Sequence, residues 1–135
     1  KEIRGVFIMK KLLMVLATIV LSISIVGCSS SKYNNDIDKV INYISEKRLN
    51  NKQLERKNIN IEVYDVNYNA DKIKGQHNTY KVTYKNKYNG TSTDLFFILD
   101  NKVQQFTSSD KGYLINMLQK KVYEENNNKN LKAEF

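Results

Sequence analysis

The sequence contains no proline, no tryptophan, one cysteine and one histidine among its 135 residues. A single cysteine excludes an intramolecular disulfide, so packing alone must stabilise the fold. The glycines are few and isolated, which excludes a glycine-rich loop of the kind that cradles phosphate groups. They are Gly5, Gly27, Gly75, Gly90 and Gly112.

Positive charge dominates among the charged residues that are present. Lysine and arginine number 22 against 14 acidic residues, which gives a formal net charge of +8. Residues 28–135 hold 18 of these bases and 13 of the acids, so 18 minus 13 leaves +5 on these 108 residues. That length suits one domain with a modest core. The charge serves either solubility or association with an anionic membrane or polymer.

An apolar segment near the N-terminus has the features of a secretory signal. Met9 precedes Lys10 and Lys11, and an apolar run over residues 12–26 follows, so Met9 is the expected translation start. The run has 15 residues. As a helix it would extend only about 22 Å. A membrane-spanning helix needs roughly 20 residues, so this run is too short. We expect residues 1–27 to be a signal peptide.

The end of this segment resembles the lipobox of bacterial lipoproteins. Ile25, Val26 and Gly27 directly precede Cys28, the only cysteine. The resemblance implies cleavage between Gly27 and Cys28, a palmitate-type diacylglycerol on the Cys28 thiol, and an extracellular location on the outer face of the cytoplasmic membrane. Two acyl chains on one residue give stable anchoring. With this thiol used for lipid, no zinc ligand set remains, and we expect neither a metal nor a cofactor.

Residues 28–35 are small and polar, which predicts a flexible tether between the lipid and the folded part. The seven residues after Cys28 reach at most about 25 Å when extended. We therefore expect the folded part to lie close to the membrane.

A helical pattern begins directly after this tether. Apolar residues recur at the spacing of one helix face, at Ile37, Val40, Ile41 and Ile44. This spacing predicts an amphipathic helix that begins at Asn35 or Asp36, with Asn35 as its N-cap, and ends between residues 49 and 57. Lys47 and Arg48 near its end suit the helix dipole.

The next part of the chain alternates as strands do. Ile59, Ile61 and Val63 alternate in one phase, and Tyr64, Val66 and Tyr68 alternate in the opposite phase. We therefore expect a strand over residues 58–70 with a bulge or sharp bend at Val63–Tyr64. Residues 71–78, which include Gly75 and His77, are expected to form a polar loop.

Two hairpins are expected to follow. Residues 79–88 place tyrosines on one face and lysines on the other, which predicts a strand that is buried on one side. Asn89–Gly90 is typical of a type I′ turn, and Asp100–Asn101 offers a second tight turn. Between these turns, residues 91–99 contain an apolar run that predicts a strand covered on both faces. Residues 102–107 are the expected returning strand.

A final helix is expected over residues 111–123, with Asp110 as its cap. Its apolar stripe would be Leu114, Met117, Leu118 and Val122. Residues 124–135 have no periodic apolar pattern and are expected to fray.

The order of these elements behind a lipobox, over residues 36–123, resembles the small Gram-positive lipoproteins that have a cystatin-like fold and no assigned function. The resemblance implies an α+β domain in which an N-terminal helix packs on a curved four-stranded antiparallel sheet, with a short C-terminal helix. Some relatives are carried by mobile genetic elements, which implies a role in transfer or exclusion. Residues 102–106 read Lys-Val-Gln-Gln-Phe and lack the Gln-x-Val-x-Gly wedge of cystatin inhibitors, so protease inhibition is not expected.

Candidate catalytic side chains are few. A lone histidine in a predicted loop, His77, is expected to be solvated rather than catalytic. Glu62, Asp65 and Asp94 are either neighbours on adjacent strands or solvated positions. Residues 80–88 interleave lysines with tyrosines, as in single-strand nucleic-acid sites. Strand alternation places the two types on opposite faces, so nucleic acid is not an expected partner.

A lipobox without a catalytic constellation favours a non-catalytic binding or accessory module, anchored to the membrane through Cys28. Its expected partner is a protein or an anionic polymer. The alternative is a small enzyme that uses the concave face of the sheet. A pocket lined by two or more of Glu62, Asp65, His77 and Asp94 would favour that alternative.

Overall fold

The computed structural model describes residues 32–135. The chain divides into two compact units, Lys1–Asn35 and Asp36–Phe135, and the second unit carries the sheet. The segment expected to be a signal peptide, Cys28 and the first part of the expected tether lie outside the described residues, so cleavage and lipidation stay predictions.

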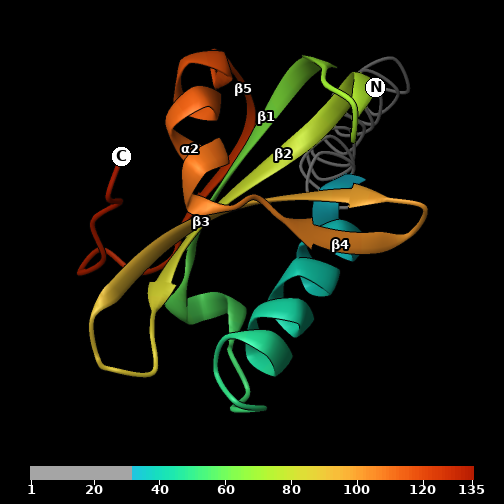
Figure 1. Ribbon diagram of the computed structural model, residues 1–135. Coiled ribbons are helices and arrows are strands. Elements are labelled where there is room, and N and C mark those ends of the chain that lie inside the picture. Colours follow the sequence, from blue (N-terminus) through green and yellow to red (C-terminus); the bar gives the residue numbers. More distant parts are fainter. Residues whose placement is uncertain (1–31) are drawn as a thin grey trace, which may run out of the picture. The chain divides into compact units, whose positions relative to one another are not determined.

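The second unit is an α+β fold built on one antiparallel sheet of five strands, in the order β4-β3-β2-β1-β5 (Figure 1). The strands are β1 (Asn60–Asn69), β2 (Lys74–Lys85), β3 (Thr91–Leu99), β4 (Lys102–Gln105) and β5 (Lys120–Asn126). The α+β class is therefore confirmed, whereas the expectation of four strands is wrong. The fifth strand comes from residues that the sequence had assigned to a helix and a frayed tail.

The N-terminal helix covers residues 32–47 and packs on one face of the sheet through the predicted stripe, whose members are almost fully buried. They are Ile37, Val40, Ile41 and Ile44. Asn35 is not its N-cap, and residues 32–35 are not a loose tether, because the chain is already helical there. Asn50 and Asn51 adopt positive φ after the last turn, which stops the helix slightly before the predicted range.

The buried pattern of β1 changes phase at Val63–Tyr64, as predicted, but the expected bulge is not in β1 itself. Val63 and Tyr64 are neighbours on opposite faces and both are buried. Pairing of β1 with β2 is continuous, but pairing with β5 shifts between these two residues, and Val122 of β5 has no partner. The extra residue of the predicted bulge therefore lies in β5.

The face of the sheet turned to the N-terminal helix can be followed across the strands. Val63 lies opposite Tyr80, and Tyr80 lies opposite Phe96, so these three side chains form one row. Tyr43 of the helix meets Phe96 edge to face at 5.8 Å. The Tyr80 hydroxyl donates to Asp36 at 2.7 Å. Aromatic contacts thus join helix and sheet.

The opposite face carries a second core, which a short C-terminal helix covers. Its buried members come from four strands or their flanks and from α2 (Ser108–Leu114): Tyr64, Val66, Tyr68, Ile73, Leu95, Phe97, Phe106 and Leu114. Thr107 caps α2 in a capping box with Asp110, so Asp110 is not itself the cap. The 3-10 turn η2 (Ile115–Met117) ends the helical part, far short of residue 123.

The C-terminal residues do not fray. Strand β5 pairs with β1, which satisfies backbone groups on an edge that would otherwise be open. The Asn128 amide donates to Asn60 Oδ1 at 2.9 Å, and the Glu134 amide donates to Thr93 Oγ1 at 2.9 Å. Residues 127–135 therefore lie along the same face as α2.

The loops between strands differ from expectation at two places. Strand β2 begins at Lys74, so His77 lies in a strand rather than in a loop. The β2–β3 loop spans residues 86–90 and has only Asn89 at positive φ, so it is no two-residue type I′ turn. Asp100–Asn101 is one, because both residues adopt positive φ between paired strands.

Candidate functional site

The four candidate acid–base residues are not brought together. Glu62 lies on the α2 face of β1, because it pairs with Lys81, while Asp65 lies on the other face. Asp94 of β3 lies opposite Val82, whereas Asp65 of β1 lies opposite Asn78, so the two are on different strands and at different levels of β2. His77 donates through Nε2 to the Lys74 carbonyl at 2.8 Å. Of these four side chains, Glu62 lines one surface pocket and Asp94 lines another, so five surface pockets of the described residues each contain at most one of them.

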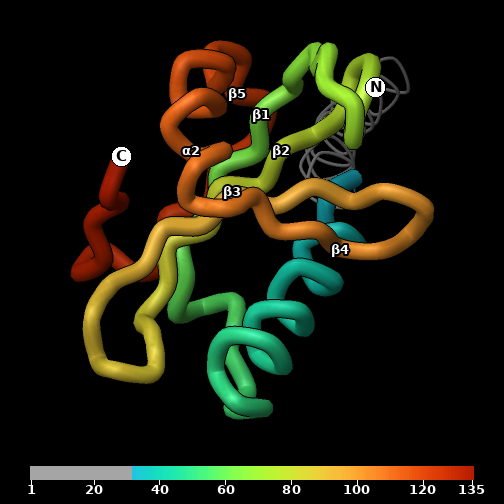
Figure 2. The backbone as a smooth tube through the Cα atoms, in the orientation of Figure 1, coloured from blue at the N-terminus to red at the C-terminus, as the bar shows by residue number. Residues whose placement is uncertain are grey.

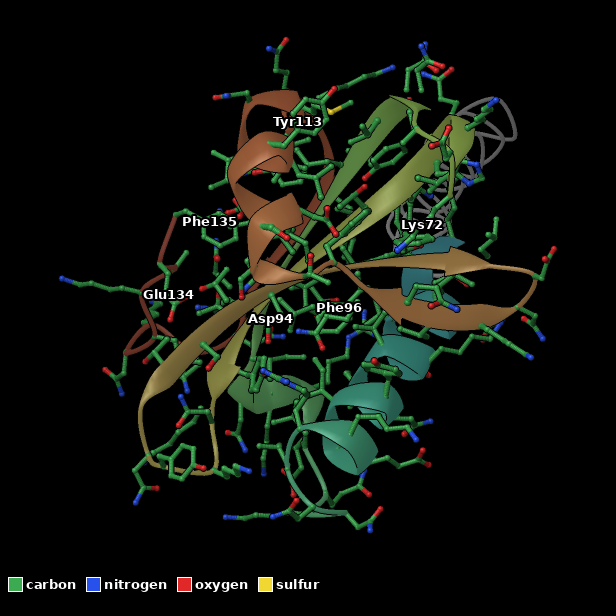
Figure 3. The ribbon with its side chains drawn as sticks, in the orientation of Figure 1. Lys72, Asp94, Phe96, Tyr113, Glu134 and Phe135 are labelled. Atoms are coloured by element: carbon green, nitrogen blue, oxygen red, sulfur yellow. The ribbon has the colours of Figure 1, made fainter. Side chains whose placement is uncertain are left out.

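Asp94 is the most deeply buried of these carboxylates, with 3% of its side chain exposed. Asp94, which is labelled in Figure 3, accepts hydrogen bonds from the Tyr84 hydroxyl and from Lys111 Nζ, each at 2.6 Å. Burial and the bond to Asp94 raise the pKa of Tyr84 far above its usual range. Arg48 also belongs to this cluster, because it shares a hydrogen bond with Tyr84. That bond raises the pKa of the Arg48 guanidinium. A carboxylate held in this way joins the sheet to α2.

A second ionic cluster lies on the α2 face. Glu62 pairs with Lys81 at 3.1 Å and with Lys121 at 2.6 Å, and Lys121 also pairs with Glu124 at 2.7 Å. Burial alone would raise the pKa of Glu62, but the two lysines outweigh it and the pKa is lowered. The Phe135 ring lies 5.1 Å from Lys81 Nζ and helps to cover the pair. These charges hold β1, β2, β5 and the C-terminal segment together.

Metal chemistry finds no support in residues 32–135, since no three His, Cys, Asp or Glu side chains lie together there. Every buried side-chain nitrogen and oxygen of that part has a hydrogen-bond partner. None of its helices has the length and apolarity needed to cross a membrane.

Positive charge gathers instead around two adjoining pockets, which we call the basic groove. It lies between the end of the N-terminal helix and the β2–β3 loop. These two backbone segments are at the bottom of Figure 2. The pockets have volumes of about 360 and 300 Å³ and share Asn86 and Lys87. Five cations line the groove: Lys47, Arg48, Lys52, Lys85 and Lys87.

The lysines of the basic groove are exposed. Within the described range, none of them forms an ion pair with a carboxylate. The acidic lining residue Glu55 is already paired with Lys57 at 3.0 Å, outside the lining. The groove therefore carries a local excess of positive charge that the fold does not neutralise.

One wall of the groove is held in place by Asn86. Its Oδ1 accepts from the amides of Tyr88 and Gly90, each at 3.0 Å. Its Nδ2 donates to Ser92 Oγ, also at 3.0 Å. A side chain that bonds the loop backbone in this way fixes the turn, so Lys87 and the 81% exposed Tyr88 project from an ordered loop.

Sequence reasoning missed the basic groove. It placed Lys85 and Lys87 on the wet face of a strand and Tyr88 on the buried face. In the structure β2 ends at Lys85, and the next residues form the loop beside the helix end. The available signal was the pair Lys47–Arg48, which had been considered only for its effect on the helix dipole.

Comparison with known proteins adds no relative. No protein-family model matches the chain, and neither a curated protein nor a solved structure does.

Proposed function

We propose that this chain is a membrane-anchored surface lipoprotein whose folded unit is a non-catalytic binding or accessory module. Residues 1–27 would be removed as a signal peptide, and diacylglycerol on Cys28 would hold the protein at the outer face of the membrane. The Ile25–Cys28 pattern supports the anchor. A helix on an antiparallel sheet is consistent with the cystatin-like fold that belongs to this proposal.

The observation that carries the binding role is the basic groove. Within the part of the chain described, the half-buried Glu62 and the buried Asp94 are each neutralised by lysines. Four exposed lysines beside one groove remain without a carboxylate. Uncompensated like charges destabilise a compact state and favour association with an anion. An anionic partner is therefore the best fit to this surface.

The enzyme alternative has less support. It requires acid–base groups that converge in one pocket, and each of the five pockets contains at most one of the four candidates. The one buried carboxylate beside a sizeable pocket, Asp94, is bonded to Lys111 and Tyr84.

Crosslinking in intact cells tests the proposal. A photo-crosslinking phenylalanine analogue at Tyr88 should give a reproducible adduct, and the same analogue at Tyr113, which is also exposed, should not give that adduct. Replacing Cys28 with Ala should abolish lipid labelling. Absence of any adduct would refute a binding module, substrate turnover by the pure protein would support the enzyme alternative, and unchanged lipid labelling would refute the anchor.

A further inference from the structure

We infer that the partner of the basic groove is a linear, hydroxyl-bearing phosphodiester polymer, which lies along the groove at the end of the unit remote from the point where the chain enters. This inference rests on the proposed binding function and names the chemical class of the partner.

The shape of the groove favours an extended ligand. Its two pockets have Asn86 and Lys87 in common, so they lie side by side along the β2–β3 loop. Cations line both sides of the groove. Lys47 and Lys52 lie on the helix side, and Lys85 lies on the strand side. A chain with regularly spaced phosphates meets charge on both walls, whereas a small anion would meet only part of it.

The neutral lining favours a ligand with hydroxyl groups. The side chains of Gln53, Asn58 and Asn89 line the groove and are exposed. No hydrogen bond from these three amide groups is found within residues 32–135. Each carboxamide offers both a donor and an acceptor, which suits alcohol groups between phosphates. Lysines supply point charges for the phosphates themselves.

The same lining argues against nucleic acid and against a membrane surface. Binding sites for single-stranded nucleic acid stack successive bases on several aromatic rings, but Tyr88 is the one large exposed hydrophobic residue of the groove. A membrane-binding surface needs a buried apolar face beside its cations. The chain enters the unit at Asp36, and the helix rises about 17 Å from there to Lys47, so the groove lies beyond the anchored end.

Binding of a fluorescent synthetic poly(glycerol phosphate) to the full-length lipidated chain in neutral detergent tests the inference. The variant Lys85→Glu/Lys87→Glu should lose at least about 30-fold in affinity, because two phosphate contacts become repulsive. The matched control Lys72→Glu/Lys74→Glu changes two exposed lysines at the other end of β2 and should change affinity less than about twofold. Lys52→Glu, on the opposite wall, should weaken binding without Lys85 or Lys87 being touched.

Salt dependence and competing ligands complete the experiment. With three to five contacts, affinity should fall about 100-fold between 50 and 200 mM salt. Oligothymidylate of equal charge, or phosphatidylglycerol vesicles, that bind as tightly as the polymer would overturn the inference, as would equal losses in both double variants. Thermal unfolding of each variant shows whether its fold is intact.

Failure of the inference is distinguishable from failure of the proposed function. If the polymer does not bind but the Tyr88 crosslink in cells persists, the binding module stands and the polymer class is wrong. If both are absent, both proposals fail.

Discussion

Lysines in two regions of this molecule differ in exposure and in ion pairing. In the Glu62 cluster, Lys81 is 10% exposed and lies 3.1 Å from a carboxylate. In the basic groove, Lys47 and Lys52 are exposed and have no carboxylate partner within the described residues. Charges of the first kind join strands, and charges of the second kind are available to a ligand. Net charge alone does not distinguish the two kinds.

The contrast exists even within one strand. Lys81 and Lys85 both belong to β2 and, four residues apart, share the α2 face. Lys81 is covered, because Phe135 lies over it and Glu62 lies beside it. Lys85 lies at the end of β2, where it lines the basic groove. A lysine that other residues cover pairs with a carboxylate and supports the fold, whereas an uncovered lysine on the same strand face stays available to a ligand.

Removal of the most deeply buried carboxylate should have the largest effect on stability. Asp94→Ala leaves Lys111 and the Tyr84 hydroxyl without their shared acceptor. We expect the free energy of unfolding to fall by about 3 kcal/mol, measured by urea denaturation at neutral pH.

A matched control for this change is Asp65→Ala. Asp65 pairs at 3.5 Å with Lys120, whose side chain is 71% exposed. Such a pair contributes less than about 1 kcal/mol. If both variants lost the same stability, the distinction between buried and exposed charge pairs would be wrong for this fold.

The Glu62 cluster should show a smaller loss and a measurable coupling. Glu62→Gln leaves Lys81 covered but without its carboxylate, at an expected cost of about 2 kcal/mol. In a Lys81→Met background the same change should cost about 1 kcal/mol less. Additive costs in this double-mutant cycle would mean that the pair makes no net contribution.

A fall in pH should reduce the stability that Glu62 and Glu125 contribute. The pKa of Glu62 is lowered, and so is that of Glu125, where burial is outweighed by hydrogen bonds from Arg56 and others. A carboxylate with a lowered pKa contributes its full stability above the ordinary glutamate pKa of about 4.3. That contribution is lost as the pH falls through the lower pKa of the folded state.

Urea denaturation from neutral pH down to about pH 3 measures this loss. The wild-type protein should lose more stability than Glu62→Gln over the acidic part of the range, because the variant has no carboxylate to protonate at that position. Equal losses in the two proteins would show that Glu62 is not stabilised by its lysines.

The sequence predicted those elements whose local pattern agrees with their tertiary surroundings. The helix stripe from Ile37 to Ile44 is one, and the change of phase at Val63–Tyr64 is another. The C-terminal strand was not predictable in this way. Its residues continue a helical stripe, but Val122 is 36% exposed in the structure. Pairing with the open edge of β1 outweighed the local pattern.

The basic groove was hidden from sequence reasoning for a related reason. Its two walls, residues 47–52 and 85–89, are far apart in the chain and meet only when the helix packs on the sheet. Neither wall has a motif of its own. The Ile25–Cys28 pattern is local, which is why the sequence alone could suggest a lipid anchor but could not reveal this groove.

The smallest expected effect on stability is that of the groove lysines themselves. Lys85→Ser/Lys87→Ser removes two exposed ammonium groups that make no ion pair within the described part of the chain. The free energy of unfolding should change by less than about 0.5 kcal/mol, and any change should be a gain, because repulsion among the five cations is reduced. The same measurement on Lys81→Ser should show a clear loss, since Glu62 would lose one of its partners. A loss above about 1 kcal/mol for the groove variant would mean that Lys85 and Lys87 support the fold rather than a ligand, because exposed charges that serve only binding contribute little to folding.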